Sequence, residues 1–329
     1  MSWLKFKQKK MKNILTFLSI LIFFNSFSQD KEFLYEIKYE LSKEFNKNPD
    51  YDILTKKYEP EKIFTKSISK KEIIINSLNI FAENAKITIK KNDNNQIDLI
   101  LDSKFSSDFV EKTYGLINLK SKKSNLLNPK MEEIRLSESF TNSFGSKYLK
   151  DSNTEFEYQT VINQSITLEN KEVNLRGSVF YEISVLTDYS KLKLNKTNVG
   201  NTIELNGLKY ELVEIRLNKV ILKKLYNNAS ENNIKLLIFN KKNDLIVADK
   251  NSINSSVSSE ECDKNYYEFL SKNKDYTLTE FKKQNKFENI ISKNGLYLIL
   301  SGVANIENDF MLYEPIYGVK KEFEVKINK

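Results

Sequence analysis

The segment TIELNGLKYEL, residues 202–212, decides the fold class of this chain. On either side of Asn206-Gly207, apolar residues alternate with polar ones, which is the pattern of a strand that buries one face. Asn-Gly is the strongest short-range hairpin signal, because a type I′ turn needs a positive φ at both central positions. The segment therefore predicts two antiparallel strands joined by a two-residue turn.

Further hairpins are expected on both sides of this segment. In each one, two short β-rich runs flank a turn that contains Asn or Asp, residue types that serve turns well. The expected strand pairs are Lys86–Lys90 with Ile97–Leu101, Val213–Ile215 with Val220–Leu222, and Leu236–Phe239 with Leu245–Val247. Single strands are also expected at residues 179–186, 296–300, 310–313 and 322–327.

The first long periodic run after the N-terminal region is ambiguous. Apolar residues alternate strictly from Phe33 to Leu41, and this pattern favours a strand. A helix is the alternative, because Phe33, Ile37, Leu41 and Phe45 also fall four residues apart. Tyr and Ile suit a pleated surface, so we expect the strand.

Helix is expected only after residue 255. Ser258 and Glu261 have the spacing of a capping box, as do Thr277 and Glu280. These two signals predict short helices over Glu260–Ser271 and Leu278–Asn285, with Cys262 on the apolar face of the first.

Together these patterns predict a mainly β fold. Without its leader the chain has about 300 residues, which suggests two domains at the usual size of about 150 residues each. We expect two antiparallel β-sandwich-like domains, at residues 29–150 and 151–329, with a short helical insertion near residues 260–285. The boundary is set at the end of a polar stretch, residues 121–153, that has little periodicity.

The N-terminal region resembles an export signal. Five lysines precede the apolar run Ile14–Phe24, and small residues then lead to an expected cleavage between Ser28 and Gln29. A signal of this kind predicts export to the periplasm, the cell surface or the medium, and its Phe-rich core and Ser-Gln junction are typical of Gram-negative bacteria. An uncleaved anchor is the alternative, although the run is short for a membrane span. No later segment approaches spanning length, so we expect no integral membrane segment after cleavage.

The basic character of the chain comes largely from this leader. The full chain has 52 Lys and Arg against 44 Asp and Glu. The leader Met1–Ser28 holds five of the lysines and no acid, so the mature chain has 47 basic against 44 acidic residues, a net charge of +3. The remaining lysines are scattered among acids, whereas a nucleic-acid binder concentrates them in a patch. We therefore expect no nucleic-acid partner.

Several kinds of catalytic site are excluded by composition. The chain has no His and one Cys, Cys262, which rules out Ser-His-Asp and Cys-His catalysis and thiolate zinc clusters. No glycine-rich phosphate loop occurs. We expect no cofactor, no metal and no catalytic residue, and we expect Cys262 to be a packing residue.

The densest group of aromatic residues is the best candidate for a binding site. It consists of Tyr266, Tyr267, Tyr297, Tyr313 and Tyr317. Tyrosines of this kind serve as platforms for glycans and proteins, although most tyrosines on β-surfaces are packing residues.

The leading hypothesis is a non-enzymatic exported protein with a binding, adhesion or scaffolding role, whose partner is an envelope protein or a glycan. It rests on the export signal, the hairpins and the missing catalytic groups. One alternative is a hydrolase that uses a pair of Asp or Glu carboxylates in place of His. Another is a secreted inhibitor or antagonist.

Overall fold

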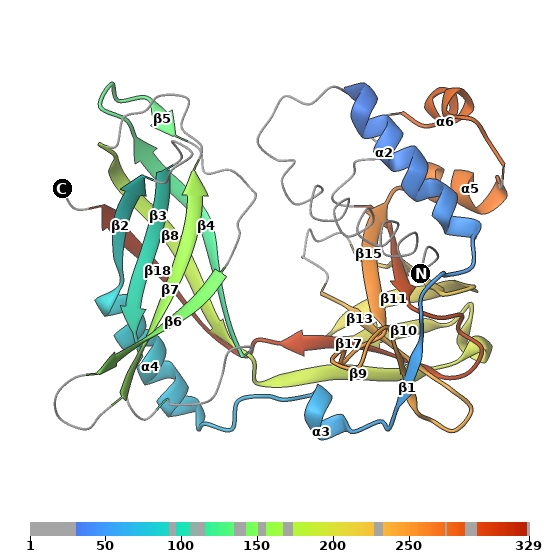
Figure 1. Ribbon diagram of the computed structural model, residues 1–329, viewed down its shortest axis with the longest axis horizontal. Helices are drawn as coiled ribbons and strands as arrows, with labels where there is room; N and C mark the ends of the chain where they lie inside the picture. Colours follow the sequence, from blue (N-terminus) through green and yellow to red (C-terminus); the bar gives the residue numbers. More distant parts are fainter. Residues whose placement is uncertain are drawn as a thin grey trace, which may run out of the picture. The chain divides into compact units, whose positions relative to one another are not determined.

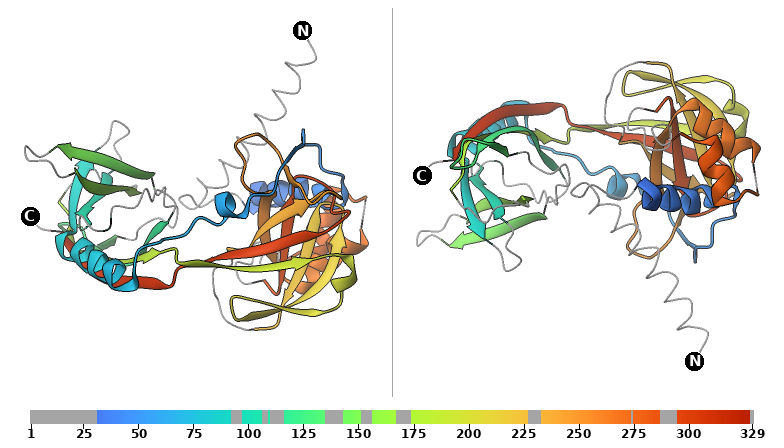
Figure 2. Two further views of the ribbon diagram at one scale, coloured as in Figure 1. Left: turned by 90° about the horizontal axis from the view of Figure 1, so that it is seen from below. Right: turned by 90° about the horizontal axis from the view of Figure 1, so that it is seen from above.

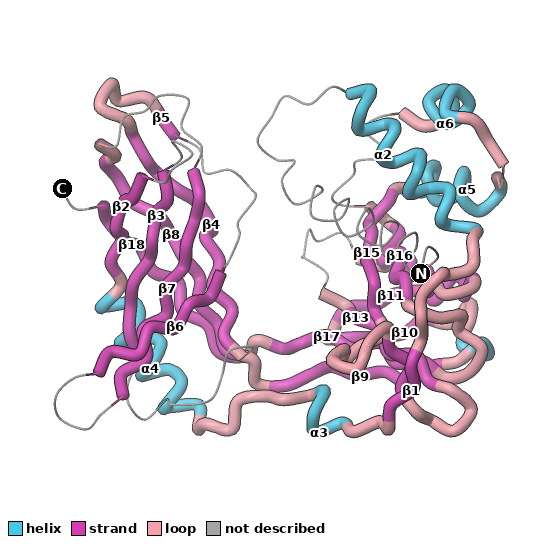
Figure 3. Tube along the Cα trace, in the orientation of Figure 1, coloured by secondary structure: helices cyan, strands magenta, loops and turns pink. Residues whose placement is uncertain are grey.

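The computed structural model of the chain describes residues 31–91, 97–105, 109, 116–134, 143–150, 156–166, 174–226, 233–273, 275–286 and 295–327. The leader and the expected cleavage site at Ser28 and Gln29 lie outside these ranges. Within them the fold is mainly β, with antiparallel sheets (Figures 1 and 3). None of the helices in these ranges combines the length and the apolar character that crossing a bilayer requires.

The hairpin predicted at residues 202–212 is confirmed. Strand β10 (Thr202–Leu205) pairs antiparallel with β11 (Leu208–Arg216), and Leu205 lies opposite Leu208 across the turn. The φ angles of Asn206 and Gly207 are 51° and 75°, as a type I′ turn requires.

The other predicted strand pairs are also confirmed. Strand β2 (Lys86–Lys91) pairs with β3 (Ile97–Lys104), β11 pairs with β12 (Lys219–Lys224), and β13 (Lys235–Phe239) pairs with β14 (Leu245–Val247). Between β11 and β12 the turn residue Leu217 has a φ of 54°, an uncommon conformation for a residue with a large side chain.

The described chain divides into two compact units. Unit 1 contains Ser67–Thr187 and Tyr317–Lys329, and unit 2 contains Asp30–Lys66 and Asp188–Ile316. A boundary near residue 150, as expected from the sequence, would separate β6 (Ser143–Lys150) from β7 (Phe156–Ile166). These two strands are paired neighbours in one sheet of unit 1. The chain passes between the units after residues 66, 187 and 316, so neither unit is one continuous stretch of sequence.

Unit 2 contains two five-stranded antiparallel sheets. The first sheet has the order β1-β14-β13-β17-β9, where β1 is Leu54–Lys56, β17 is Phe310–Ile316 and β9 is Asp188–Leu194. The second sheet has the order β10-β11-β12-β16-β15, where β16 is Tyr297–Gly302 and β15 is Ser256–Cys262. One hydrophobic core takes side chains from both sheets.

Both faces of these sheets bury apolar side chains. In β13, Leu236 and Ile238 enter the core that the sheets share, whereas Leu237 and Phe239 point to the opposite face. That face is covered by the segment around α3 (Pro60–Ile63). The outer face of the second sheet is covered by three helices, α2 (Lys31–Lys43), α5 (Lys264–Lys272) and α6 (Leu278–Gln284), together with the short η1 (Glu44–Asn46) (Figure 2).

The strand expected at Phe33–Leu41 is wrong, because this segment forms helix α2. Its buried side follows helical spacing, and Tyr35 and Tyr39 contact Phe281 of α6 edge-on or tilted, at ring-centroid distances of 6.4 and 5.8 Å. The Tyr39 hydroxyl also donates a hydrogen bond to the carbonyl of Tyr276, at 3.1 Å. Phe33 and Leu41, which both the strand and the helix interpretation placed on the buried face, are 41% and 37% exposed.

The first C-terminal helix begins later than expected. Ser258 and Glu261 form no capping box, because they belong to strand β15, which pairs with β16. The helix starts after Asp263, whose carboxylate accepts the backbone N–H of Tyr266 at 2.7 Å. Before α6, Thr277 and Glu280 do form the expected capping box. Helix is not confined to this region, since α2 and α4 (Lys71–Asn84) precede it.

Unit 1 packs one helix against two four-stranded sheets. The sheets have the orders β18-β8-β4-β5 and β2-β3-β7-β6, where β18 is Val319–Ile327, β8 is Arg176–Val185, β4 is Ile117–Leu127 and β5 is Glu133–Ile134. Three α4 side chains, Ile74, Leu78 and Phe81, join residues of β3, β4, β8 and β18 in one core. A helix with one such apolar stripe needs a sheet to cover it.

A close approach between strands in unit 1 requires a glycine. Gly177 in β8 has a φ of 122°, and a Cβ atom there would collide with the backbone oxygen of Asn125 in β4. We expect Gly177→Ala to lower the free energy of unfolding by about 2–4 kcal/mol, measured by urea denaturation. The matched control is Gly200→Ala, because Gly200 also has a positive φ but has open space around it. Its expected cost is about 1 kcal/mol, and equal costs for the two variants would contradict the steric explanation.

Candidate functional site

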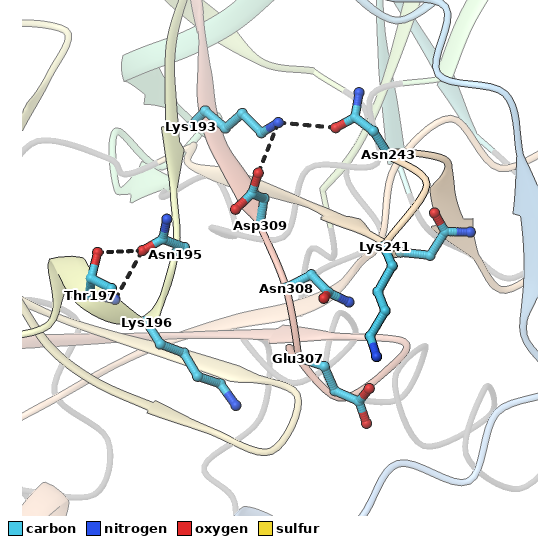
Figure 4. A pocket seen from close by; sticks show the side chains of 10 residues that line it. Lys193, Asn195, Lys196, Thr197, Lys241, Asn243, Glu307, Asn308 and Asp309 are labelled. Carbon is cyan, nitrogen blue, oxygen red and sulfur yellow. Dashed lines mark hydrogen bonds and ion pairs between the residues drawn. The ribbon is translucent and has the colours of Figure 1, made fainter.

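Three turns meet at one end of the first sheet of unit 2 and line a pocket of about 430 Å³ (Figure 4). One turn follows β9 at residues 195–197, one joins β13 to β14 at residues 240–243, and one precedes β17 at residues 307–309. The ends meet because Leu194 of β9 lies opposite Phe310 of β17, while the N–H of Phe239 donates to the carbonyl of Asp309. Antiparallel neighbours thus bring together residues that are far apart in the sequence.

Lys193 of β9 contacts both the second and the third turn. Its Nζ lies 3.0 Å from Oδ2 of Asp309 and 3.0 Å from Oδ1 of Asn243 (Figure 4). An ion pair at this exposure adds little stability by itself. Its effect is geometric, because a single ammonium group holds the second and third turns at a fixed distance from β9.

Asparagine side chains fix the shape of the first two turns. Asn195 Oδ1 accepts hydrogen bonds from the backbone N–H and the hydroxyl of Thr197, at 2.9 and 2.6 Å. Asn240 Oδ1 accepts the backbone N–H groups of Lys242 and Asp244, at 2.8 and 2.9 Å. Side chains that bond to their own turn in this way hold the backbone in one conformation. The backbone of these two turns is therefore held by the turns' own side chains.

Three other charged side chains line the pocket. Lys196, Lys241 and Glu307 are exposed, and within the described ranges none of the three takes part in an ion pair. In Figure 4 their charged ends extend toward the same side of the view. Since Lys193 and Asp309 neutralise each other, these three groups leave the pocket with one surplus positive charge.

The tyrosine group predicted from the sequence is placed differently. Tyr266, Tyr267 and Tyr297 do meet, in the core beneath α5, and the rings of Tyr267 and Tyr297 stack at 4.4 Å. Tyr313 lies in the core on the outer face of the first sheet, and Tyr317 is half-buried in unit 1. The first four are at most 8% exposed, so they offer little ring surface to a ligand in this conformation.

Burial also changes the acidity of these tyrosines. Desolvation raises the pKa of Tyr266, Tyr267 and Tyr313. The Tyr267 hydroxyl donates to Oε2 of Glu214 at 3.1 Å. A buried hydroxyl with a fixed acceptor is typical of a packing residue with a polar end.

The sequence carried only a weak signal for the pocket. Residues 240–244 are predicted as a hairpin turn, but Asn and Lys are common throughout this chain, so an Asn-Lys turn does not stand out. Nothing in the sequence shows that residues near 195, 241 and 308 are neighbours, because that proximity follows from the strand order. No protein-family model matches the chain, and no curated protein is significantly similar to it.

The single thiol lies outside the pocket. Cys262 is 1% exposed, and it sits at the end of β15 rather than on a helix face. Burial raises the pKa of this thiol, and the nearby Glu260 and Asp263 carboxylates raise it further.

We expect Cys262 to resist alkylation in the folded protein. Iodoacetamide at neutral pH should modify the native chain at least about 100-fold more slowly than the urea-unfolded chain, because both access and thiolate are lacking. Mass spectrometry of timed samples measures the two rates. Rapid stoichiometric labelling of the native chain would contradict the burial of this thiol.

Proposed function

We propose that this protein is an exported, non-enzymatic binding protein that recognises a saccharide bearing an acidic group at the pocket of unit 2. The observation that carries the proposal is the convergence of three turns, two of them braced by internal hydrogen bonds, on a polar pocket. Its volume, about 430 Å³, falls within the usual range of small-ligand sites. Adhesion or scaffolding on an acidic glycan would use the same contacts.

The chemistry of the lining supports a ligand of this class. Amide side chains such as Asn308 offer both a donor and an acceptor, which suits the hydroxyl groups of a sugar. Lys196 and Lys241 provide ammonium groups without described ion pairs, which suit a carboxylate, sulfate or phosphate substituent. Glu307 accepts hydrogen bonds from hydroxyls and disfavours a ligand with many negative charges.

The scaffold supports the same proposal. We infer a sandwich-like arrangement for each unit, because two sheets contribute side chains to one core in both. In unit 2 the loops at one end of such a scaffold are held by strands that are buried on both faces. Binding loops on a rigid β scaffold are a common arrangement for recognition.

The hydrolase alternative has one feature in its favour. Glu307 and Asp309 both line the pocket, and a carboxylate pair is the minimum for hydrolysis without His. Asp309 is, however, held by Lys193 at 3.0 Å, so its carboxylate already has a partner. Activity on a panel of glycosides that Glu307→Gln abolishes would favour the hydrolase over the binding protein.

The pocket lysines provide the main test. In a binding assay against acidic and neutral saccharides, the unaltered protein should prefer acidic ones, and Lys196→Ala with Lys241→Ala should weaken that binding about tenfold or more. The matched control is Lys242→Ala, because Lys242 belongs to the same turn as Lys241 but does not line the pocket. Rising salt should weaken the binding of acidic saccharides.

Three results would count against the proposal. The first is equal binding of neutral and acidic saccharides, and the second is equal loss in the control variant. The third is capture of an envelope protein whose binding is unaffected by the lysine changes, which would favour a protein partner or an inhibitory role at another surface.

Export is tested separately. We expect the protein expressed in a Gram-negative host to appear in the periplasm or outside the cell with Gln29 as its first residue, because Ser26 and Ser28 present small side chains to the signal peptidase. Cell fractionation followed by mass spectrometry of the N-terminal peptide measures this. A membrane-bound product that retains the apolar run Ile14–Phe24 would support the uncleaved anchor instead.

A further inference from the structure

The first sheet of unit 2 ends in a short edge strand. Strand β1 pairs with β14 through three residue pairs, from Leu54 with Val247 to Lys56 with Leu245. No described strand pairs with its other side, because β1 stands at the end of the strand order (Figure 1). A free edge of this kind presents backbone N–H and C=O groups that can pair with the strand of another molecule.

The side chains at the centre of this edge are apolar. Tyr51, Ile53 and Leu54 are 39%, 50% and 40% exposed. Proteins commonly protect an edge strand from pairing by placing lysines on it. The opposite edge of the same sheet, β9, has this protection, since it carries Lys191 and Lys193. The centre of the β1 edge does not.

Opposite charges flank the apolar centre. Asp50 and Asp52 precede it in the sequence. Lys56 and Lys57 follow it. When two copies of this segment run antiparallel, the acidic half of each copy lies beside the basic half of the other, whereas a parallel arrangement would place like charges together. The charge pattern is therefore complementary to itself in the antiparallel direction.

The two lysines keep their charge available. The Nζ of Lys56 donates to the carbonyl oxygens of Lys250 and Ser252, at 2.7 and 2.8 Å. Both acceptors are neutral, so these bonds position the ammonium group without compensating its charge. Glu59 lies close enough to be affected by both lysines, but its carboxylate is 2.5 Å from the ammonium of Lys62.

Symmetry restricts the register of a pair of β1 strands. The two-fold axis between adjacent antiparallel strands is perpendicular to the sheet, so opposite residues must belong to the same face of the strand. With the strand continued through residues 51–57, the register centred on Leu54 places Leu54 opposite its own copy and Asp52 opposite Lys56. It also places Tyr51 opposite Lys57, where the ammonium group can lie over the ring. Each charged contact then occurs twice, once for each copy.

We propose that two copies of this protein associate through β1, in the antiparallel register centred on Leu54, and join their first sheets into one continuous sheet. The contact uses the same edge on both copies, so it closes at two and leaves no free β1 edge. Pro49 and Pro60 limit its length, because proline has no backbone N–H for the ladder. A contact this short gives a reversible dimer rather than a permanent one.

Charge reversal tests the pairing. Sedimentation velocity of the purified protein at concentrations up to about 1 mM should show an equilibrium between monomer and dimer. Asp50→Lys with Asp52→Lys should raise the dimer Kd about tenfold or more, because like charges then lie opposite each other. Lys56→Glu with Lys57→Glu should have the same effect for the same reason. An equimolar mixture of the two double variants should recover the dimer.

The matched control changes the same charges elsewhere. Lys320→Glu with Lys321→Glu alters two exposed lysines of unit 1, and the dimer Kd should stay within about twofold of its original value. The proposal is overturned if the unaltered protein is monomeric at every concentration, if the β1 variants change the Kd no more than this control does, or if their mixture fails to recover the dimer.

A cysteine at the centre of the contact tests the register. The native Cys262 is buried, so a new thiol on the β1 edge is the reactive one. Under mild oxidation, Leu54→Cys should give a disulfide-linked dimer, because its Cα atom and that of its copy would lie within the span of a disulfide. The control is Thr55→Cys, which is also exposed but would lie about 7–8 Å from its copy, too far for the bond. Equal yields of linked dimer from the two variants would overturn the register centred on Leu54.

Discussion

The fold of unit 2 depends on the burial of both faces of its sheets. In β12, Val220 and Leu222 enter the core between the sheets while Ile221 faces the helices, and all three are fully buried. A sheet of this kind needs a second cover on its outer side, because apolar side chains on an open face would stay in water. The N-terminal segment supplies much of that cover: helix α2 and η1 lie over one sheet, and the segment around α3 lies over the other.

This need for a cover explains why residues 33–41 form a helix although they alternate like a strand. A strand at that place would present only half of its side chains to the helices α5 and α6, whereas a helix presents one continuous stripe. Hydrogen bonds fix the C-terminal end of this helical segment. Asn46 of η1 donates to the carbonyls of Leu270 and Asn273, both at 3.1 Å. Arg216 of β11 then donates to Asn46 Oδ1 at 2.9 Å, which connects the stripe to the sheet beneath.

The sequence predicts local pairing well and distant pairing poorly. The type I′ hairpin could be predicted because Asn206-Gly207 specifies a backbone conformation that few other dipeptides tolerate. The predicted start of α5 is wrong because Ser258 and Glu261 have the spacing of a capping box but belong to strand β15, which pairs with β16. The N-cap of the helix is Asp263, which that spacing did not indicate. The division into units follows from strand partners that are far apart in sequence, such as β8 and β18, and no local pattern reports them. The pocket shares this property, since its three turns are brought together only by the order of β9, β17 and β13.

The strand β17 shows how double-sided burial directs polar chemistry to the ends of strands. Phe310 and Leu312 lie in the core that the two sheets share, and Tyr313 lies in the core on the outer face, where the half-buried Met311 packs against it. The centre of the strand therefore has no room for polar groups. Polar groups therefore gather where the strand begins, at Asp309 in the pocket, and where its pairing with β13 ends, at Glu314. The two sites differ in what burial does to them. Asp309 remains near water and is held by Lys193, so its role is to position a turn for a ligand. Glu314 is buried, and although Asn206 and Asn233 hydrogen-bond to it, desolvation raises the pKa of its carboxyl.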